Sequence, residues 1–272
     1  MHKDKEKEYS SSVVMITGAA QGIGKVLAMK FGLAGAKVVL VDIKKQLGLE
    51  VLNYFRNLGI DAHFIHVDLQ EENQIEKMIL EAVKIYGGLD VLINNARVPL
   101  SKKRFPMSLE DWDKALDVML KAPAVATGFA LPYLEKSHNG CVINISSTNS
   151  FLISEQPLTY HLAKASILQL TRHLAVELAS KKIRVNAICP GLVDIEDRRP
   201  MLSQEPVNQF LIEHVVPLQR TAAPDEIGEL ALFLASNRAS YITGQSYVID
   251  GGMSLCDQFA VAKKVYLSGF GE

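Results

Sequence analysis

The feature that most constrains the fold of this chain is an alternation of short apolar runs with longer stretches of helical period. The seven apolar runs are rich in Val and Ile and apolar on both faces, which is typical of buried parallel strands. They span residues 13–16, 37–41, 62–67, 89–93, 141–145, 183–188 and 246–249. Between them the period predicts helices over residues 22–35, 45–57, 71–86, 109–136, 158–180 and 225–235. The sequence therefore predicts an α/β fold, a doubly wound parallel sheet of seven strands with helices on both faces.

Domain organisation follows from the interruptions in that alternation. No internal repeat, low-complexity segment or linker rich in Pro, Gly and Ser divides the 272 residues, so we expect a single domain over residues 12–252. Residues 1–11 form a charged N-terminal tail, and residues 253–272 form a C-terminal tail. Residues 192–217 are polar, helix-poor and too long for a plain connection, so we expect a lid on the substrate side.

Composition and charge exclude several classes of function. The formal net charge is -1, so no field of the whole protein attracts nucleic acid or an anionic membrane. The three cysteines form no C-x-x-C pair and the histidines form no H-E-x-x-H or Cys/His cluster, so we expect reduced thiols and no metal site. The N-terminal run has no apolar core, and the apolar stretch over residues 124–134 is too short to span a bilayer. A soluble, cytoplasmic protein is expected.

The turn after the first predicted strand is rich in glycine and opens a helix. It reads Thr17, Gly18, Ala19, Ala20, Gln21, Gly22, Ile23, Gly24. Glycines here let the backbone turn sharply and approach a pyrophosphate at the helix N-terminus, although a plain strand-to-helix turn also has this composition. Asp42 ends the second strand, where a carboxylate accepts ribose hydroxyls and repels a 2′-phosphate, unless it is only a solvated strand end. NAD is favoured, and Lys44 and Lys45 leave NADP as the less likely cofactor.

Two further strand ends extend this pattern into a resemblance. Asp68 and Leu69 follow the third strand, and Asn94, Asn95 and Ala96 follow the fourth. With the glycine turn, these residues resemble the short-chain dehydrogenase/reductase family, which has a Rossmann-type fold. The family's T-G-x-x-x-G-x-G motif is matched in full, its adenine-contacting Asp matches Asp68, and its N-N-A-G motif is matched except at the last position. Arg97 stands where the family has glycine.

A candidate chemical site lies in the second half of the chain. Tyr160 and Lys164 are one helical turn apart on the same face, and a neighbouring cation moves the tyrosine pKa from ~10 towards neutral pH. Such pairs are common on helix surfaces. Ser147 lies thirteen residues before Tyr160, and its hydroxyl either binds a substrate oxygen or caps a turn. His161 is expected at a solvated helix position.

The resemblance decides between these alternatives. The family has a catalytic Ser at this spacing before a Y-x-x-x-K motif, which implies Ser147, Tyr160 and Lys164 as catalytic residues. It also implies a P-G turn beside the nicotinamide. The cofactor contacts implied in this way are Gly18, Gln21, Gly22, Ile23, Gly24, Asp42, Asp68, Leu69, Asn95, Ala96, Tyr160, Lys164, Pro190, Gly191 and Val193. The matches run from about residue 12 to residue 252. The implied reaction is hydride transfer between NAD(H) and a small secondary alcohol or ketone.

Two further departures from the family pattern support a competing function. Met119 stands where the family has an Asn that completes a proton relay to the lysine, and methionine offers no amide donor. Ile195 replaces the usual Thr after the P-G turn. The competing hypothesis is a catalytically weak or inactive NAD-binding protein that acts as a sensor, scaffold or partner subunit. The intact Ser147, Tyr160 and Lys164 favour the enzyme.

Two predicted helices carry wide apolar or small-residue faces. The first has Ala122, Ala124, Ala126 and Gly128, and the second has a broad leucine-rich surface between residues 158 and 180. These faces exceed what one sheet covers, and the family resemblance also implies self-association, so we expect a homodimer or homotetramer.

Overall fold

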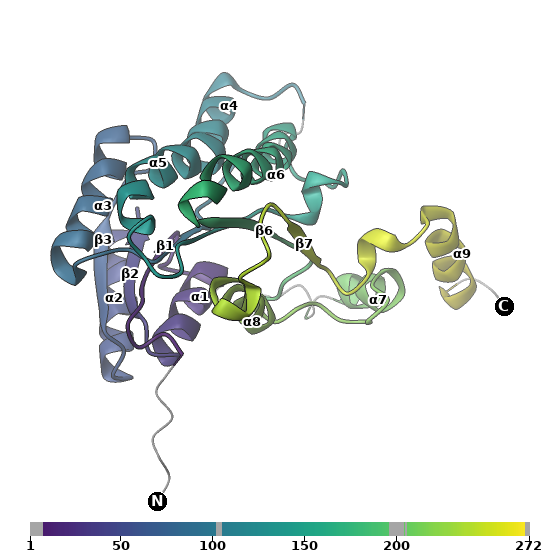
Figure 1. Ribbon diagram of the computed structural model, residues 1–272. Helices are drawn as coiled ribbons and strands as arrows, with labels where there is room; N and C mark the ends of the chain where they lie inside the picture. The colour runs from purple at the N-terminus through teal and green to yellow at the C-terminus, as the bar shows by residue number, and fades with distance from the viewer. Residues whose placement is uncertain (1–7, 102–104, 196–203, 205, 270–272) are drawn as a thin grey trace, which may run out of the picture.

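The sheet of the protein has the predicted number of strands and the predicted direction. The computed structural model describes residues 8–101, 105–195, 204 and 206–269. Seven parallel strands lie in the order β3-β2-β1-β4-β5-β6-β7 (Figure 1). Their bounds are β1 (Val13–Thr17), β2 (Lys37–Asp42), β3 (Ala62–His66), β4 (Val91–Asn94), β5 (Cys141–Ile145), β6 (Arg184–Pro190) and β7 (Ser246–Ile249). The doubly wound α/β prediction is confirmed.

Helices cover both faces of this sheet and enclose one core on each side. Figure 1 shows α1 (Gly22–Leu33) and α8 (Pro224–Ala235) below the sheet, and α5 (Ala122–Leu134) and α6 (Leu158–Leu178) above it. The remaining layer helices are α2 (Lys45–Asn57) and α3 (Glu72–Tyr86). Successive strand side chains point to opposite faces. Val14 and Ile16 therefore belong to the core under α1 and α8, and Val13 and Met15 belong to the core under α3 and α5.

The helix predicted over residues 109–136 is a continuous run with a wider turn in its middle. It consists of α4 (Leu109–Leu116), a π-helical turn (Asp117–Lys121) and α5. Ser108 caps its start, because the Ser108 hydroxyl accepts a hydrogen bond of 3.1 Å from the Asp111 N–H. In the π turn the Ala122 N–H reaches back to the Asp117 carbonyl. Pro123 has no N–H to donate to the Met119 carbonyl, which removes one α-helical bond from this turn.

The same run, Leu109–Leu134, is long and apolar enough to cross a membrane when length and composition alone are considered. Its second half, α5, packs against α3, β4 and β5. A core helix of a layered α/β protein has the same length and composition. The small and apolar residues of α5 are buried on the side that packs against the sheet. The apolar character of this run therefore fits its place in the helix layer.

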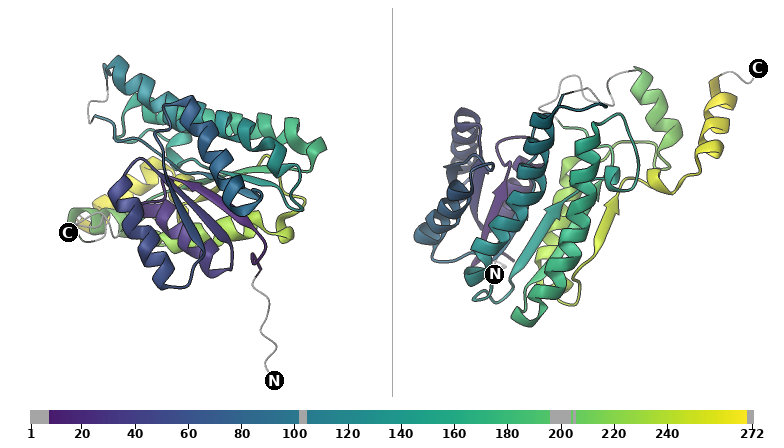
Figure 2. Two further views of the ribbon diagram at one scale, coloured as in Figure 1. Left: turned by 90° about the vertical axis from the view of Figure 1, so that its left-hand side faces the viewer. Right: turned by 90° about the horizontal axis from the view of Figure 1, so that it is seen from above.

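Two helices lie where the sequence predicted none. Residues 206–215 of the polar, helix-poor segment form α7 (Pro206–Val215), and the C-terminal tail holds α9 (Gln258–Gly269). Figure 2 shows them side by side, beyond the β7 edge of the sheet. The prediction of a helix-poor segment was wrong for residues 206–215, where Val207, Phe210, Leu211, Ile212 and Val215 recur at helical spacing. Of these, Ile212 is buried. Residues 196–203 and 205 of the expected lid lie outside the described residues.

Candidate functional site

The glycine turn after β1 has a backbone that only glycine permits. Gly18 and Gly22 have left-handed φ values of 67° and 57°. A Cβ on Gly24 would lie 2.1 Å from the carbonyl oxygen of Gly18. The turn is therefore closed tightly against the first turn of α1, and its backbone N–H groups form the kind of cradle that binds a phosphate at a helix N-terminus. The residues present fit a dinucleotide at this position.

The two other predicted residues of this turn differ in their surroundings. Gln21 immediately precedes α1, and its side-chain oxygen accepts a hydrogen bond of 2.8 Å from the Lys44 ammonium. Ile23 packs against the core under α1. Ile195 lies over the turn, with its Cγ2 atom 3.5 Å from the position of a Cβ on Gly22. An apolar side chain therefore covers the glycine turn where the family has a hydroxyl.

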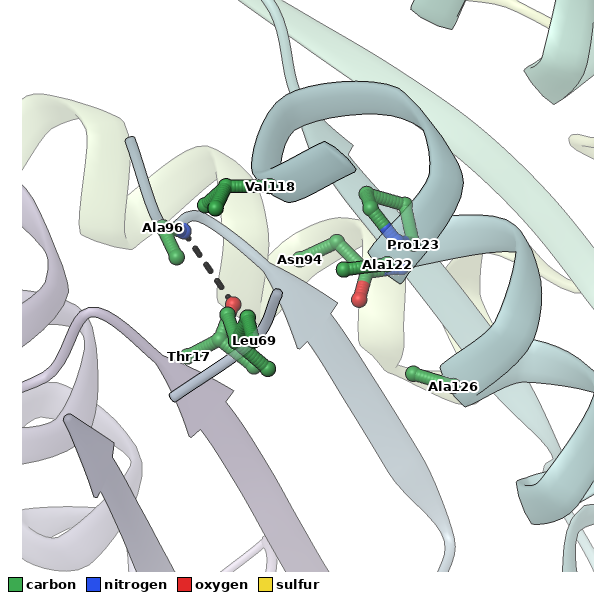
Figure 3. Close-up of a pocket in the computed structure, with 8 residues that line it drawn as sticks. All are labelled: Thr17, Leu69, Asn94, Ala96, Val118, Ala122, Pro123 and Ala126. Atoms are coloured by element: carbon green, nitrogen blue, oxygen red, sulfur yellow. Dashed lines mark hydrogen bonds between the residues drawn. The ribbon is translucent and has the colours of Figure 1, made fainter. Parts of the chain in front are cut away.

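Asn95 fastens the end of β4 to the glycine turn. Its amide nitrogen donates to the carbonyl oxygens of Thr17, at 2.9 Å, and Gly18, at 3.2 Å. The Thr17 hydroxyl in turn accepts a hydrogen bond of 3.0 Å from the Asn95 N–H. It also accepts one of 3.1 Å from the Ala96 N–H, which Figure 3 shows as a dashed line. Both predicted residues therefore hold the edge of the site together through the backbone, a role that the motif alone did not indicate.

A small pocket lies next to the hydrogen bond between Thr17 and Ala96 (Figure 3). It is lined by Thr17, Leu69, Asn94, Ala96, Val118, Ala122, Pro123 and Ala126. Its volume of about 10 Å³ is close to the smallest space that holds one water molecule. It is therefore too small for a dinucleotide or a substrate, although the predicted residues Leu69 and Ala96 line it.

Asp42 is a buried carboxylate at the end of β2, so the alternative of a solvated strand end was wrong. One of its oxygens accepts from the Ala20 N–H and the other from the Lys44 N–H, each at 2.9 Å. These bonds fix the carboxylate beside the glycine turn. Asp68, after β3, accepts a hydrogen bond of 3.0 Å from the Gln70 N–H.

Lys164 is a buried cation close to Tyr160. Its ammonium donates a hydrogen bond of 2.7 Å to the Ile145 carbonyl at the end of β5 and lies 5.8 Å from the centre of the Tyr160 ring. Burial lowers the pKa of Lys164 from 10.5 to about 8, and the positive charge of Arg97 acts in the same direction. The predicted Tyr/Lys pair is thus brought together at the carboxyl edge of the sheet.

The two neighbouring serines after β5 have different partners. The Ser146 hydroxyl donates to the Lys164 carbonyl at 2.7 Å and lies 2.6 Å from the Ser150 hydroxyl, so it ties α6 to β5. The Ser147 oxygen accepts a hydrogen bond of 3.2 Å from the Asn149 N–H and caps the short turn Thr148–Ser150. The capping interpretation of Ser147 is therefore correct, and it leaves the Ser147 O–H as a donor for a bound oxygen.

His161 is buried, and the expectation of a solvated position was wrong. Its Nε2 atom accepts from the Ser154 N–H and its Nδ1 atom lies against the Pro157 carbonyl, each at 3.0 Å. This bonding requires a neutral ring with its proton on Nδ1. His161 therefore holds the loop before α6 close to Tyr160. Helical period alone gave no signal for it, because the loop that covers it comes from outside the helix.

Sequence reasoning also missed a chain of buried polar side chains behind the site. The Asn94 amide donates to the Asn144 side-chain oxygen at 2.8 Å, and the Asn144 amide donates to the Thr171 hydroxyl at 2.9 Å. The Thr171 hydroxyl donates to the Ile167 carbonyl at 2.8 Å. The chain links β4, β5 and α6, and the parallel register pairs Asn94 directly with Asn144.

Cys189 was considered only as a reduced thiol, and it lies near Lys164 and the serines. Burial raises the pKa of Cys189 to about 11, against the opposing effects of Ser146 and Lys164, so it is a neutral thiol at neutral pH. All three cysteines are free thiols, and Cys256 is exposed.

The P-G turn after β6 is held by its neighbours. A Cβ on Gly191 would lie 2.6 Å from the Asp250 Cβ, so the closing segment packs directly on this glycine, which follows Pro190. Val193 is buried and forms an isolated bridge with Ala222, just before α8. The predicted nicotinamide side of the site is therefore anchored to the last strand and to the start of α8.

Met119 lies against the chemical site. It is only 1% exposed and packs with Ala115, Ala163 and Tyr160. No group of three His, Cys, Asp or Glu side chains that could hold a metal ion occurs within the described part of the chain. The site as a whole offers a tyrosine hydroxyl, a buried cation near the tyrosine ring and a serine hydroxyl after β5.

Comparisons with known proteins agree with this geometry. A family model described as enoyl-(acyl carrier protein) reductase matches residues 18–254. The 3-oxoacyl-[acyl-carrier-protein] reductase FabG of Thermotoga maritima is 35% identical over 245 residues, which cover 89% of this chain and 97% of that protein. The dehydrogenase/reductase SDR family member 4 of Homo sapiens is 33% identical over 246 residues, which cover 89% of this chain and 87% of that protein.

Solved structures share the fold over most of their length. The crystal structure of gox2181 has a TM-score of 0.85 and 25% identity, covering 92% of this chain and 99% of that one. A mutant short-chain dehydrogenase/reductase of Serratia marcescens has a TM-score of 0.83 and 27% identity, covering 91% of this chain and 99% of that one. Since a family model and relatives more than 30% identical extend along most of the sequence, the chain belongs to the short-chain dehydrogenase/reductase family of oxidoreductases.

Proposed function

We propose that this chain is an NAD(H)-dependent oxidoreductase that interconverts a secondary alcohol and a ketone, with Tyr160 as proton donor and acceptor. The observation that carries the proposal is the buried Lys164 ammonium 5.8 Å from the Tyr160 ring. A cation at this position attracts the negative charge that develops on the tyrosine oxygen while its proton is transferred. The nicotinamide ring, when bound, supplies or accepts the hydride.

The other site residues position the reacting oxygen. The Ser147 O–H donates to the carbonyl oxygen as negative charge develops on it, which is where a fixed donor lowers the barrier most. Ser146 keeps the Lys164 backbone against β5, and Lys164 itself keeps its hydrogen bond to Ile145. Tyr160 gives its proton to that oxygen during reduction and takes it back during oxidation.

Asp42 supports NAD(H) over NADP(H) as the cofactor. Its carboxylate is fixed beside the glycine turn by two backbone N–H groups, so it cannot swing away from a 2′-phosphate without losing both bonds. The Lys44 ammonium is engaged by the Gln21 side chain at 2.8 Å, which lowers its value as a phosphate ligand. NADP(H) is the less favoured cofactor.

The test of the proposal is turnover by the unmodified protein compared with Tyr160→Phe. Loss of an aligned proton donor costs about 10²–10⁴-fold in rate. We expect NADH-dependent reduction of at least one ketone in a broad panel, and its loss in Tyr160→Phe. The control is Tyr86→Phe, which removes a hydroxyl at the end of α3 that donates to the Asp61 carboxylate. This variant should keep full activity. Turnover that survives Tyr160→Phe contradicts the assignment of Tyr160.

A second candidate function is a catalytically weak or inactive NAD-binding protein, a sensor, scaffold or partner subunit. The observation that favours it is Met119, an apolar side chain packed on Tyr160 at the family's relay position. Absence of turnover with every substrate, together with tight NADH binding, is the result expected for this candidate.

We also propose that the protein works as a cytoplasmic homodimer or homotetramer. Val176 on α6 is 81% exposed and Leu162 is 38% exposed, so part of the leucine-rich face has no cover within one chain. Burial of such a face between two copies is a common basis of symmetric association. Light scattering at micromolar concentration tests this, and a monomer contradicts it.

A further inference from the structure

The segment between the serine and the tyrosine of the site begins with three apolar residues that are not buried. Residues 151–157 join the short turn after β5 to the start of α6. The apolar run is Phe151, Leu152 and Ile153, of which Phe151 is 52% exposed and Ile153 is 81% exposed. A run of apolar residues that the fold leaves unburied is typical of a functional surface. This run follows the carboxyl end of β5, and an α/β sheet binds its ligands at that edge.

The reacting groups on either side of this segment are held in place by other contacts. The Ser146 hydroxyl donates to the Lys164 carbonyl at 2.7 Å, and the Ser150 hydroxyl donates to the same oxygen at 2.9 Å. These two bonds tie the turn after β5 directly to α6. The relative positions of Ser147 and Tyr160 therefore do not depend on the middle of the segment.

The side chain of His161 reaches from α6 to the middle of the segment. It is only 7% exposed. Its Nε2 atom accepts a hydrogen bond of 3.0 Å from the Ser154 N–H, and its Nδ1–H donates one of 3.0 Å to the Pro157 carbonyl. The His161 ring also lies edge to face with the Tyr160 ring, with the ring centres 6.4 Å apart and the planes at 84°. His161 thus fixes the segment beside the tyrosine.

We propose that His161 is a positioning residue that holds the apolar run beside Tyr160, where the run binds an alkyl chain of the substrate. The inference rests on the proposed function, and it makes the substrate a ketone or secondary alcohol that carries an alkyl chain of several carbons. Each methylene group that an apolar surface removes from water strengthens binding by about fourfold. Contact with two or three methylene groups therefore favours a longer chain by about 10–10²-fold.

The cofactor is the other candidate occupant of this surface. The predicted cofactor contacts follow β1, β2, β3, β4 and β6 or lie on α6, and none of them falls within residues 151–157. This distribution favours the substrate. The experiment separates the two occupants by measuring NADH affinity and ketone affinity in the same variants.

The test compares two ketones that differ only in chain length, 2-butanone and 2-octanone. Binding to the complex of protein and NADH is followed by NADH fluorescence, and turnover by NADH absorbance. In His161→Asn the amide replaces the Nδ1 donor but ends short of the Ser154 N–H, whereas in His161→Gln the amide oxygen reaches it. His173→Asn, at an exposed histidine of the same helix, is the matched control. Hydrogen exchange of residues 151–157 reports whether the segment has been released.

The expected result is tighter binding of 2-octanone than of 2-butanone by about 10–10²-fold. His161→Asn should reduce this ratio by about tenfold and should speed exchange in residues 151–157 by about tenfold, because the Ser154 N–H loses its acceptor. NADH affinity should not change. His161→Gln should keep most of the ratio and of the protection from exchange, and His173→Asn should keep all of both.

An unchanged ratio or an unchanged exchange rate in His161→Asn overturns the inference, and so does the lack of any chain-length preference in the unmodified protein. An equal loss of NADH affinity in His161→Asn also overturns it, because the effect then extends to the whole site. Selective binding of 2-octanone without turnover, reduced in His161→Asn, upholds His161 and defeats the proposed function. Turnover of both ketones at equal efficiency does the reverse.

Discussion

The cofactor end and the chemical end of the site are built in different ways. At the cofactor end, Thr17, Asp42 and Asn95 are bonded to backbone groups. Gly18 and Gly24 in the turn leave no room for a Cβ. At the chemical end, Tyr160 and Lys164 are in place, but their surroundings contain Met119 and the charge of Arg97. Dinucleotide recognition depends on backbone geometry that tolerates few residues. Substrate recognition depends on side chains that can change without disturbing the sheet.

If the cofactor end depends on backbone geometry, adding a single methyl group to its glycine turn should cause a large loss of NADH affinity. In Gly24→Ala the new Cβ would meet the Gly18 carbonyl oxygen at 2.1 Å, so the turn must move. We expect NADH affinity to fall more than about 10²-fold. A fall of this size corresponds to a loss of about 3 kcal/mol in binding free energy. Gly88→Ala is the matched control, because a Cβ there meets nothing within 4 Å. A fluorescence titration that gives equal affinities for both variants contradicts this account of the turn.

At the chemical end, the buried Lys164 makes the stability of the fold depend on pH. Lowering its pKa from 10.5 to about 8 corresponds to about 3 kcal/mol. Because the folded pKa lies below the unfolded one, the unfolded chain holds more protons between about pH 8 and 10, and the unfolding free energy rises across this window. Lys164→Met should lack this rise. Lys136→Met, at an exposed lysine, should keep it.

Urea unfolding at neutral and alkaline pH measures these slopes. If the unmodified protein and Lys164→Met respond equally to pH, the ammonium of Lys164 is not the source of the dependence.

Met119 offers a way to bring the chemical end closer to the family pattern. We predict that Met119→Asn raises turnover by about 10–10²-fold, because a relay is only part of the proton-transfer contribution. The structure adds a cost, since the new amide enters an apolar cluster at a site only 1% exposed and lowers stability by about 1–3 kcal/mol. Met78→Asn, at another fully buried methionine, should show the loss of stability without the gain in turnover. A gain in both variants, or in neither, contradicts the relay interpretation.

The smallest expected effect concerns the choice of cofactor. Asp42→Asn removes the charge and keeps one acceptor oxygen for the backbone N–H groups of Ala20 and Lys44. We expect the preference for NADH over NADPH to narrow by about tenfold, the effect of one charge-assisted hydrogen bond. Asp61→Asn, which affects only the Tyr86 hydroxyl bond among those described, is the control. Equal affinity for the two cofactors in the unmodified protein contradicts the role of Asp42.

The sequence predicted the sheet in full and the chemical site in outline. Strands of parallel sheets are apolar on both faces, so their period is visible without knowledge of their neighbours. The four-residue spacing of Tyr160 and Lys164 likewise follows from helix geometry. The burial of His161 and the action of Arg97 on Lys164 depend on segments that meet only in the folded chain. The helix α7 was missed because its apolar residues pack beyond the sheet, near α9, where the layer pattern does not apply.

The chain of Asn94, Asn144 and Thr171 has a consequence for protein engineering by recombination. Each of its amide or hydroxyl groups is buried and depends on the next, so exchanging one position alone leaves a partner unpaired at a cost of about 1–3 kcal/mol. Replacing all three with apolar side chains of the same shape is expected to be nearly neutral. A chimera that takes β4 from one parent and β5 or α6 from another must therefore inherit the three positions together, and a crossover placed between residues 94 and 171 separates them.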